Sequence, residues 1–186
     1  MSESVLLTVD GDRRTVDTGT TGADLFAGRP EIVVVRINGE LFDLDVPIPD
    51  GAVVEAVPID SPDGLDVLRH SCSHVLAQAV QQINPDAKLG IGPHITDGYY
   101  YDFDVAEPFT PDQLREIEKV MARIVKEGQK FERRELTDDE ARSACADEPY
   151  KLELISLKSE AETVAEGASL EVGEGGLTLY QNVRRD

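Results

Sequence analysis

Two histidines four residues apart, His70 and His74, are the side chains of this sequence best suited to chemistry. A spacing of four on a helix brings two imidazoles onto one face, within reach of one metal ion, one water or one substrate hydroxyl. A catalytic zinc site usually takes three protein ligands, and no glutamate follows His70 as it does in the zinc-protease motif. We therefore expect no metal site, with a zinc ion held by this pair as the alternative. On spacing alone, two hydrogen-bonded helical histidines without a ligand are the commoner outcome.

The element that must position these histidines is a long amphipathic helix from Leu65 to Ile83, which Pro85 ends. At about 100° per residue, His70 and His74 fall on the side of this helix that also carries Ala77 and Gln81. The opposite side is predicted to be the buried stripe, because apolar residues recur there at steps of three and four: Leu65, Leu68, Cys72, Leu76, Ala79 and Ile83.

The 60 residues at the N-terminus form a β-rich segment with one short helix after Thr21. Asn38-Gly39 between two apolar runs is the strongest short-range signal for a two-residue hairpin. Ser61-Pro62-Asp63 interrupts the strand pattern, so we expect a linker at 61–63 between domains at 1–60 and 64–186. The order of elements predicts a ubiquitin-like β-grasp in the first domain, with strands at 5–9, 15–16, 32–37, 41–44 and 53–57.

The second domain is predicted to combine helices with an antiparallel sheet, so that the fold class of the chain is α+β. Thr110 and Thr137 each begin a capping box ahead of a helix. Gly128 ends the first of these helices, whose buried face is predicted to consist of Leu114, Ile117, Met121, Ile124 and Val125. Gly90 and Gly92 do not form a phosphate-binding loop, because Pro93 lacks the amide donor that such a loop needs, and close backbone packing is the expected role. Strands are predicted at 89–93, 99–104, 131–136, 170–172 and 177–180.

The composition limits the classes of function. Lys+Arg 18 against Asp+Glu 37 gives a net charge of −19, which argues against a general nucleic-acid binder, because phosphate backbones favour positive surfaces. No apolar run is long enough to cross a membrane, and Cys72 and Cys145 give neither metal-finger spacing nor a disulfide framework, so we expect a cytoplasmic protein. Any contact with tRNA would use local basic residues, which are Lys126, Lys130, Arg133, Arg134, Arg184 and Arg185. The alternative for the first four is a solvated helix end whose positive charges favour the helix dipole.

Four segments in register resemble the N-terminal region of the bacterial threonyl-tRNA synthetases. The first 60 residues resemble the TGS domain of that family, so the resemblance covers essentially the whole chain. The four segments, which resemble the second N-terminal domain, are Arg69-His70-Ser71-Cys72-Ser73-His74-Val75-Leu76-Ala77, Lys88-Leu89-Gly90-Ile91-Gly92-Pro93, Asp97-Gly98-Tyr99-Tyr100-Tyr101-Asp102-Phe103 and Glu148-Pro149-Tyr150-Lys151-Leu152-Glu153-Leu154-Ile155.

In that family the second domain is a proofreading hydrolase that removes serine wrongly attached to the tRNA for threonine. Its site combines an H-x-x-x-H helix, a lysine, a tyrosine and a downstream C-x-x-x-H element. The resemblance implies that His70 and His74 hold the attacking water, that Lys151 stabilises the developing oxyanion, and that Tyr101 is the tyrosine of the site. From the residues alone, Lys151 would be a surface lysine and Tyr101 a core ring.

One element of the family pattern has no counterpart, because no histidine follows Cys145. We therefore expect the 186 residues alone to be inactive, with an editing domain that is incomplete at its C-terminus. The resemblance places the zinc, the ATP and the homodimer contacts of the parent enzyme in a ligase domain absent from this sequence. No cofactor and no membrane contact are expected here, and the expected partner is the tRNA for threonine.

Two other classes of function remain open. One is a TGS-type module that binds tRNA or a protein without catalysis, which the missing C-x-x-x-H element favours. The other is a free-standing, metal-dependent hydrolase that edits in trans, since related alanyl-type editing domains use the same two half-motifs around zinc. Two histidines supply fewer ligands than that chemistry usually requires.

Overall fold

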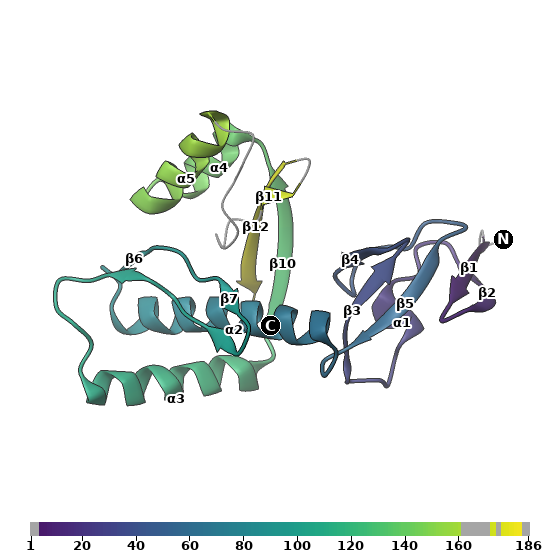
Figure 1. Cartoon of the computed structure of the whole chain (residues 1–186), viewed down its shortest axis with the longest axis horizontal. Coiled ribbons are helices and arrows are strands. Elements are labelled where there is room, and N and C mark those ends of the chain that lie inside the picture. The colour runs from purple at the N-terminus through teal and green to yellow at the C-terminus, as the bar shows by residue number, and fades with distance from the viewer. Residues whose placement is uncertain (1–3, 161–171, 174–175, 184–186) are drawn as a thin grey trace. The chain divides into compact units, whose positions relative to one another are not determined.

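The structure, a computed structural model, describes residues 4–160, 172–173 and 176–183 (Figure 1). The chain is α+β, as predicted, and divides into two compact units, Met1–Leu68 and Arg69–Asp186. The division falls within helix α2 (Pro62–Ile83). We expected a linker at residues 61–63, but Pro62 and Asp63 are the first two residues of this helix.

The first unit is a five-stranded sheet in the order β2-β1-β5-β3-β4, the strand order of a ubiquitin-like β-grasp. β1 and β5 are parallel, and the other neighbours are antiparallel. The predicted strands are all present, within one or two residues of their expected ends for most of them. Their bounds are β1 (Ser4–Val9), β2 (Asp12–Asp17), β3 (Ile32–Ile37), β4 (Glu40–Phe42) and β5 (Val53–Pro58).

Local sequence signals account for the turns and the helix of this sheet. Asn38 and Gly39 both have positive φ, 52° and 96°, as a type I′ hairpin requires. Helix α1 (Gly22–Leu25) begins with a capping box, in which the Thr21 side chain accepts the Asp24 amide and the Asp24 carboxylate accepts the Thr21 amide. A Cβ on Gly22 would lie 2.8 Å from Val35 Cγ1, so the helix packs closely on the sheet.

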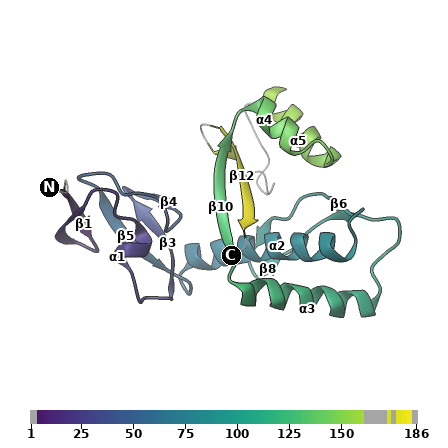
Figure 2. The same ribbon diagram turned by 180° about the vertical axis from the view of Figure 1, so that it is seen from behind.

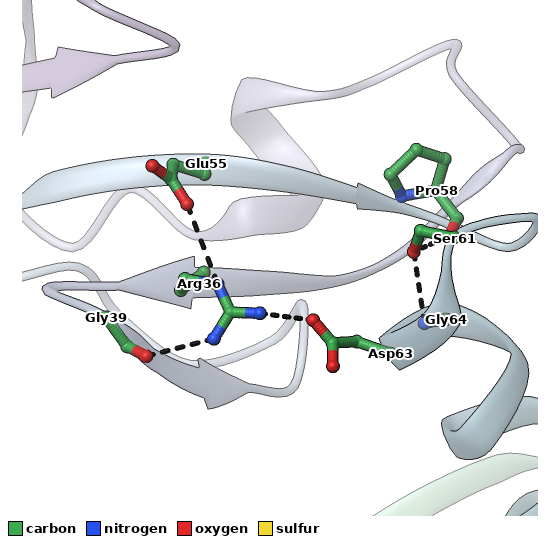
Figure 3. A network of polar contacts seen from close by, with 7 residues as sticks. All are labelled: Arg36, Gly39, Glu55, Pro58, Ser61, Asp63 and Gly64. Atoms are coloured by element: carbon green, nitrogen blue, oxygen red, sulfur yellow. Dashed lines mark hydrogen bonds and ion pairs between the residues drawn. The ribbon is translucent and has the colours of Figure 1, made fainter.

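Arg36 of β3 ties the first turn of α2 to this sheet (Figure 3). Its guanidinium donates to Gly39 O at 3.0 Å and forms ion pairs with Asp63 and, at 3.6 Å, with Glu55. Asp63 lies in the first turn of α2, where a carboxylate also favours the helix dipole. The ion pairs involve partly exposed side chains, so we assign them only a small contribution to stability.

Hydrogen bonds and close backbone packing also hold the first turn of α2. Ser61 Oγ donates to Pro58 O at 2.6 Å and accepts the Gly64 amide at 3.1 Å (Figure 3). A Cβ on Gly64 would lie 2.0 Å from Pro58 O, so only glycine fits at this position. Contacts within the first unit therefore hold the first turn of α2 against its sheet.

The second unit is built on α2 and helix α3 (Pro111–Glu127), which lie side by side in both views (Figure 1 and Figure 2). Two short hairpin ladders follow α2, and a three-stranded sheet in the order β10-β12-β11 follows α3. The remaining bounds are β6 (Lys88–Leu89), β7 (His94–Ile95), β8 (Gly98–Tyr99), β9 (Phe103–Asp104), β10 (Lys130–Leu136), α4 (Asp138–Ala144), α5 (Pro149–Glu160), β11 (Val172–Gly173) and β12 (Gly176–Val183).

The buried face of α2 differs from the predicted stripe. Leu65 and Leu68 are 36% and 39% exposed, because they precede the part of α2 that packs in the second unit. Ala77, which we placed on the far side, is buried. The core between α2 and α3 is formed by Val75, Ala79, Val80, Ala87, Ile117 and Ile124.

Helix α3 has the predicted caps but a narrower buried face. Thr110 and Gln113 form the capping box, and Gly128 ends the helix in the left-handed region at φ 59°. Ile117 and Ile124 are buried, whereas Leu114 and Val125, also predicted to be buried, are 53% and 67% exposed. Ile117 and Ile124 are seven residues apart, so α3 contributes one line of residues to the core where we had predicted a broad stripe.

Two parts of the sequence prediction involve residues outside the described ranges. The strand predicted at 170–172 begins outside them, at Leu170, and the basic pair Arg184 and Arg185 lies wholly outside them. None of the helices in the described part of the chain is both long enough and apolar enough to span a membrane.

Candidate functional site

His70 and His74 contact one another on the second-unit part of α2. Their Nε2 atoms are 3.1 Å apart, and the two rings meet edge to face with centroids separated by 4.7 Å. At this distance one imidazole donates an N–H to the other, so one Nε2 carries the proton and the other accepts. Ser73 between them is fully buried, and its Oγ donates to His70 O at 2.8 Å.

His74 is the imidazole with the perturbed proton affinity. Burial, followed by electrostatic interactions with His70 and with Lys151, lowers the pKa of His74 from 6.5 to about 4. Both causes disfavour the charged imidazolium. At neutral pH His74 is therefore an uncharged imidazole that can donate or accept one hydrogen bond at each ring nitrogen according to its tautomer.

Two aromatic rings from the β10–β12 ladder enclose His74. Phe131 of β10 lies 5.9 Å from the His74 ring centroid, and Tyr180 of β12 lies 6.0 Å from it. The two strands pair antiparallel, with Phe131 opposite Asn182 and Arg133 opposite Tyr180. Sequence reasoning did not assign either ring to the site, because the pairing joins residues about 50 positions apart and no local pattern reports it.

His94 is a third imidazole beside the pair. Its ring centroid is 6.5 Å from that of His70, and the planes meet at 88°. His94 lies in β7, in the hairpin that follows α2, and its side chain is exposed. Sequence reasoning assigned this residue no role, since its loop carried only the glycine and proline signals.

Lys151, in the first turn of α5, interacts electrostatically with His74. Its charge contributes to the lowered pKa of His74, and it acts on the buried thiol of Cys145, whose pKa is raised chiefly by burial. The preceding Glu148 accepts hydrogen bonds from the Gln81 side chain and the Leu89 amide, both at 2.9 Å. Sequence reasoning did not assign a helix to residues 149–160.

Tyr101 stacks on the ring of Phe103. Its ring is parallel to that of Phe103, with centroids 4.8 Å apart and planes at 21°. A Cβ on Gly92 would lie 2.1 Å from Tyr101 Cδ2, and one on Gly90 would lie 2.9 Å from Asp102 O. The close backbone packing predicted for these two glycines is confirmed. The structure thus brings His70, His74 and Lys151 into one electrostatic group and seats Tyr101 on the neighbouring hairpin.

Bacterial proteins named threonine--tRNA ligase align with nearly the whole chain. The protein of Pseudarthrobacter chlorophenolicus is 59% identical over 184 residues, that of Micrococcus luteus 58% over 187, and that of Streptomyces coelicolor 56% over 181. These alignments cover 99%, 100% and 96% of this chain. The chain belongs to the threonyl-tRNA synthetase family, as an N-terminal region.

The chain corresponds to only part of the length of those synthetases. The chain spans 28% of the length of the first two relatives and 27% of the third. A search with protein-family models gives no match. The family assignment therefore rests on identities above one half along an alignment that includes every candidate site residue.

In this synthetase region, no cluster of three or more histidine, cysteine, aspartate or glutamate side chains is arranged to hold a metal ion among the described residues. The two Nε2 atoms of the histidine pair face each other at hydrogen-bond distance. A pair of this kind orients a hydrogen-bonded ligand such as water without needing a metal.

A separate groove of about 540 Å³ lies between the hairpin and the start of α5. Carboxylates from Asp102, Asp104 and Glu153 line it together with Phe103, and none of the predicted site residues is part of its wall. Tyr150 at its edge donates to Asp104 Oδ2 at 2.8 Å.

Proposed function

We propose that this chain is the proofreading region of a threonyl-tRNA synthetase, and that the His70–His74 pair lies at the site that hydrolyses serine from mischarged tRNA. The observation that carries the proposal is the contact of two imidazoles, one held neutral, with a lysine charge acting on the same ring. Its relatives are named threonine--tRNA ligase, so the whole enzyme is proposed to attach threonine to tRNA.

The need for such a site is physical. Serine differs from threonine by one methyl group, and a pocket that fits threonine discriminates against a substrate lacking a methyl group by only about 1–3 kcal/mol. Selection by binding alone therefore leaves a substantial error. A second, hydrolytic site that acts on the ester provides the remaining discrimination.

The electrostatics assign different tasks to the site residues. A general base is most effective when its pKa is near the working pH, and His74, at about 4, accepts a proton poorly at neutral pH. We assign His74 to orienting the attacking water through a neutral ring nitrogen, with His70 as its hydrogen-bond partner. Lys151 supplies positive charge for the oxyanion that forms when water attacks the ester carbonyl.

Tyr101 is proposed to contribute a wall and a hydroxyl to the substrate cleft. Its ring is fixed between Phe103 and the backbone at Gly92, so the position of its hydroxyl is determined by packing. Preorganised groups of this kind avoid the cost of ordering a side chain when the substrate binds.

The proposed partner is the tRNA for threonine, approached through local basic residues on an otherwise acidic protein. Lys126 lies in the last turn of α3, and Arg134 lies exposed on the adjacent β10. With a net charge of −19, affinity for tRNA is expected to be low for this region and to fall steeply with salt. The first unit is proposed to be the TGS domain of the synthetase.

The proposal is tested by binding of a seryl-adenosine analogue in which an amide replaces the ester. Titration of this probe into the isotope-labelled chain should shift the nuclear magnetic resonance (NMR) signals of His70, His74 and Lys151. His74→Ala should remove these shifts, and His94→Gln, which changes an exposed neighbouring imidazole, serves as the comparison. Shifts confined to the acidic groove, or shifts that survive His74→Ala unchanged, would overturn the assignment of the site.

A further inference from the structure

We infer that Glu148 is the residue that positions Lys151 beside His74, by fastening the start of α5 to α2 and to the hairpin. In catalytic terms this inference rests on the proposed function, because Lys151 touches substrate only if the site hydrolyses an ester. In structural terms it concerns the placement of one charge, which can be measured without any substrate.

The carboxylate of Glu148 joins three elements. Oε1 accepts the Gln81 side-chain amide of α2 at 2.9 Å, and Oε2 accepts the Leu89 backbone amide of β6 at 2.9 Å. The backbone carbonyl of Glu148 also accepts the Leu152 amide at 3.1 Å and so begins α5. Both hydrogen bonds of the side chain are partly buried, and Leu89 itself is buried, so water does not readily replace the carboxylate.

Lys151 lies three residues after Glu148, in the first turn of the same helix. A displacement of this turn therefore moves the ammonium group directly. A second polar link at this end of α5, among the described residues, is the bond from Tyr150 to Asp104, and both of those side chains are exposed. Hydrogen bonds at exposed positions exchange with water at little cost, so the structure assigns the positioning to Glu148.

His74 reports where Lys151 lies. Its neighbours are His70 on the same helix, the Lys151 charge from α5, and the rings of Phe131 and Tyr180. Withdrawal of Lys151 removes a positive charge and raises the pKa of His74, whereas loss of a nearby carboxylate by itself lowers it. The two consequences of changing Glu148 thus have opposite signs, and the direction of the shift separates them.

The experiment is a double-mutant cycle on the 186-residue chain, read from the NMR titration of His74. We expect Lys151→Met to raise the pKa of His74 from about 4 toward 6.5, and Glu148→Gln to raise it as well. In the double variant the second change should add little to the first, because the lysine is already displaced. Glutamine can accept only one of the two amide donors that glutamate accepts, so it breaks the junction with minimal change in size.

Two control variants lie on the same helix. Glu153→Gln removes an equal charge without touching α2 or β6, and Tyr150→Phe removes the exposed link; both should leave the pKa of His74 unchanged. Additive shifts in the cycle, or a lowered pKa of His74 in Glu148→Gln, would overturn the inference. Failure of the proposed function looks different: the cycle would still be non-additive, while ester hydrolysis by a longer synthetase would not depend on Lys151.

Discussion

Acidification should weaken the second unit through His74, and the sign follows from the direction of its pKa shift. The pKa of His74 is about 4 in the folded chain and 6.5 when unperturbed, so the unfolded chain binds the additional proton between these values. With respect to His74, the free energy of unfolding therefore has its full value above pH 6.5. It falls as the pH decreases from 6.5 to 4, and the contribution of His74 is then constant below that window.

The magnitude follows from the same two values. A shift of about 2.5 pKa units corresponds to about 3 kcal/mol over the whole window, and about 2 kcal/mol of this is lost between about pH 7 and about pH 5. For a domain whose total stability is roughly 5–15 kcal/mol, such a loss is readily measured.

Urea unfolding monitored by tyrosine fluorescence reports on the second unit, because the chain has no tryptophan and all five tyrosines follow Leu68. The free energy of unfolding of the wild-type chain should fall more steeply from neutral to mildly acidic pH than that of His74→Gln. Groups that do not interact with His74 make the same contribution in both proteins, so their effects cancel in the difference. His94→Gln, an exposed comparison, should retain the wild-type slope. Equal slopes for the wild-type chain and His74→Gln would refute the assignment of a buried neutral imidazole.

Three further predictions concern packing, capping and metal binding. Gly92→Ala should destabilise the second unit and alter the environment of Tyr101, whose ring a Cβ would overlap, while Gly98→Ala meets no atom within 4 Å and should be tolerated; urea unfolding compares the two. Thr110→Ala should cost about 1 kcal/mol in the same assay, because it removes the N-cap of α3. Calorimetric titration should detect no stoichiometric, submicromolar zinc site, and such a site, if lost in His70→Ala, would contradict this expectation.

Elements defined by short-range chemistry were predictable from sequence. Asn38-Gly39 predicted a hairpin because only a few residues accept positive φ, and the structure confirms it. The capping boxes at Thr110 and Thr137 predicted helix starts because both partners of each hydrogen bond lie within four residues. The histidine contact on α2 was likewise expected, since a spacing of four on a helix already brings two side chains together.

Features that depend on tertiary packing were not predictable. Leu65 and Leu68 continue the apolar period of α2, but their exposure depends on where the second unit begins. Tyr180 reaches His74 only because β12 pairs with β10, and that register is not encoded locally. The role of Glu148 depends in the same way on Leu89, 59 residues earlier in the chain.

The central claim is that the His70–His74 pair belongs to a hydrolytic site for seryl-tRNA. The most direct measurement is the rate of release of serine from seryl-tRNA for threonine by a synthetase of the relatives' length that carries this region, compared with the same protein bearing His74→Ala. His94→Gln is the matched control for loss of an imidazole. Loss of a group that orients the attacking water commonly costs about 10²-fold or more in rate, so His74→Ala should fall by at least that factor while threonine attachment persists. Undiminished release of serine by His74→Ala would contradict the account.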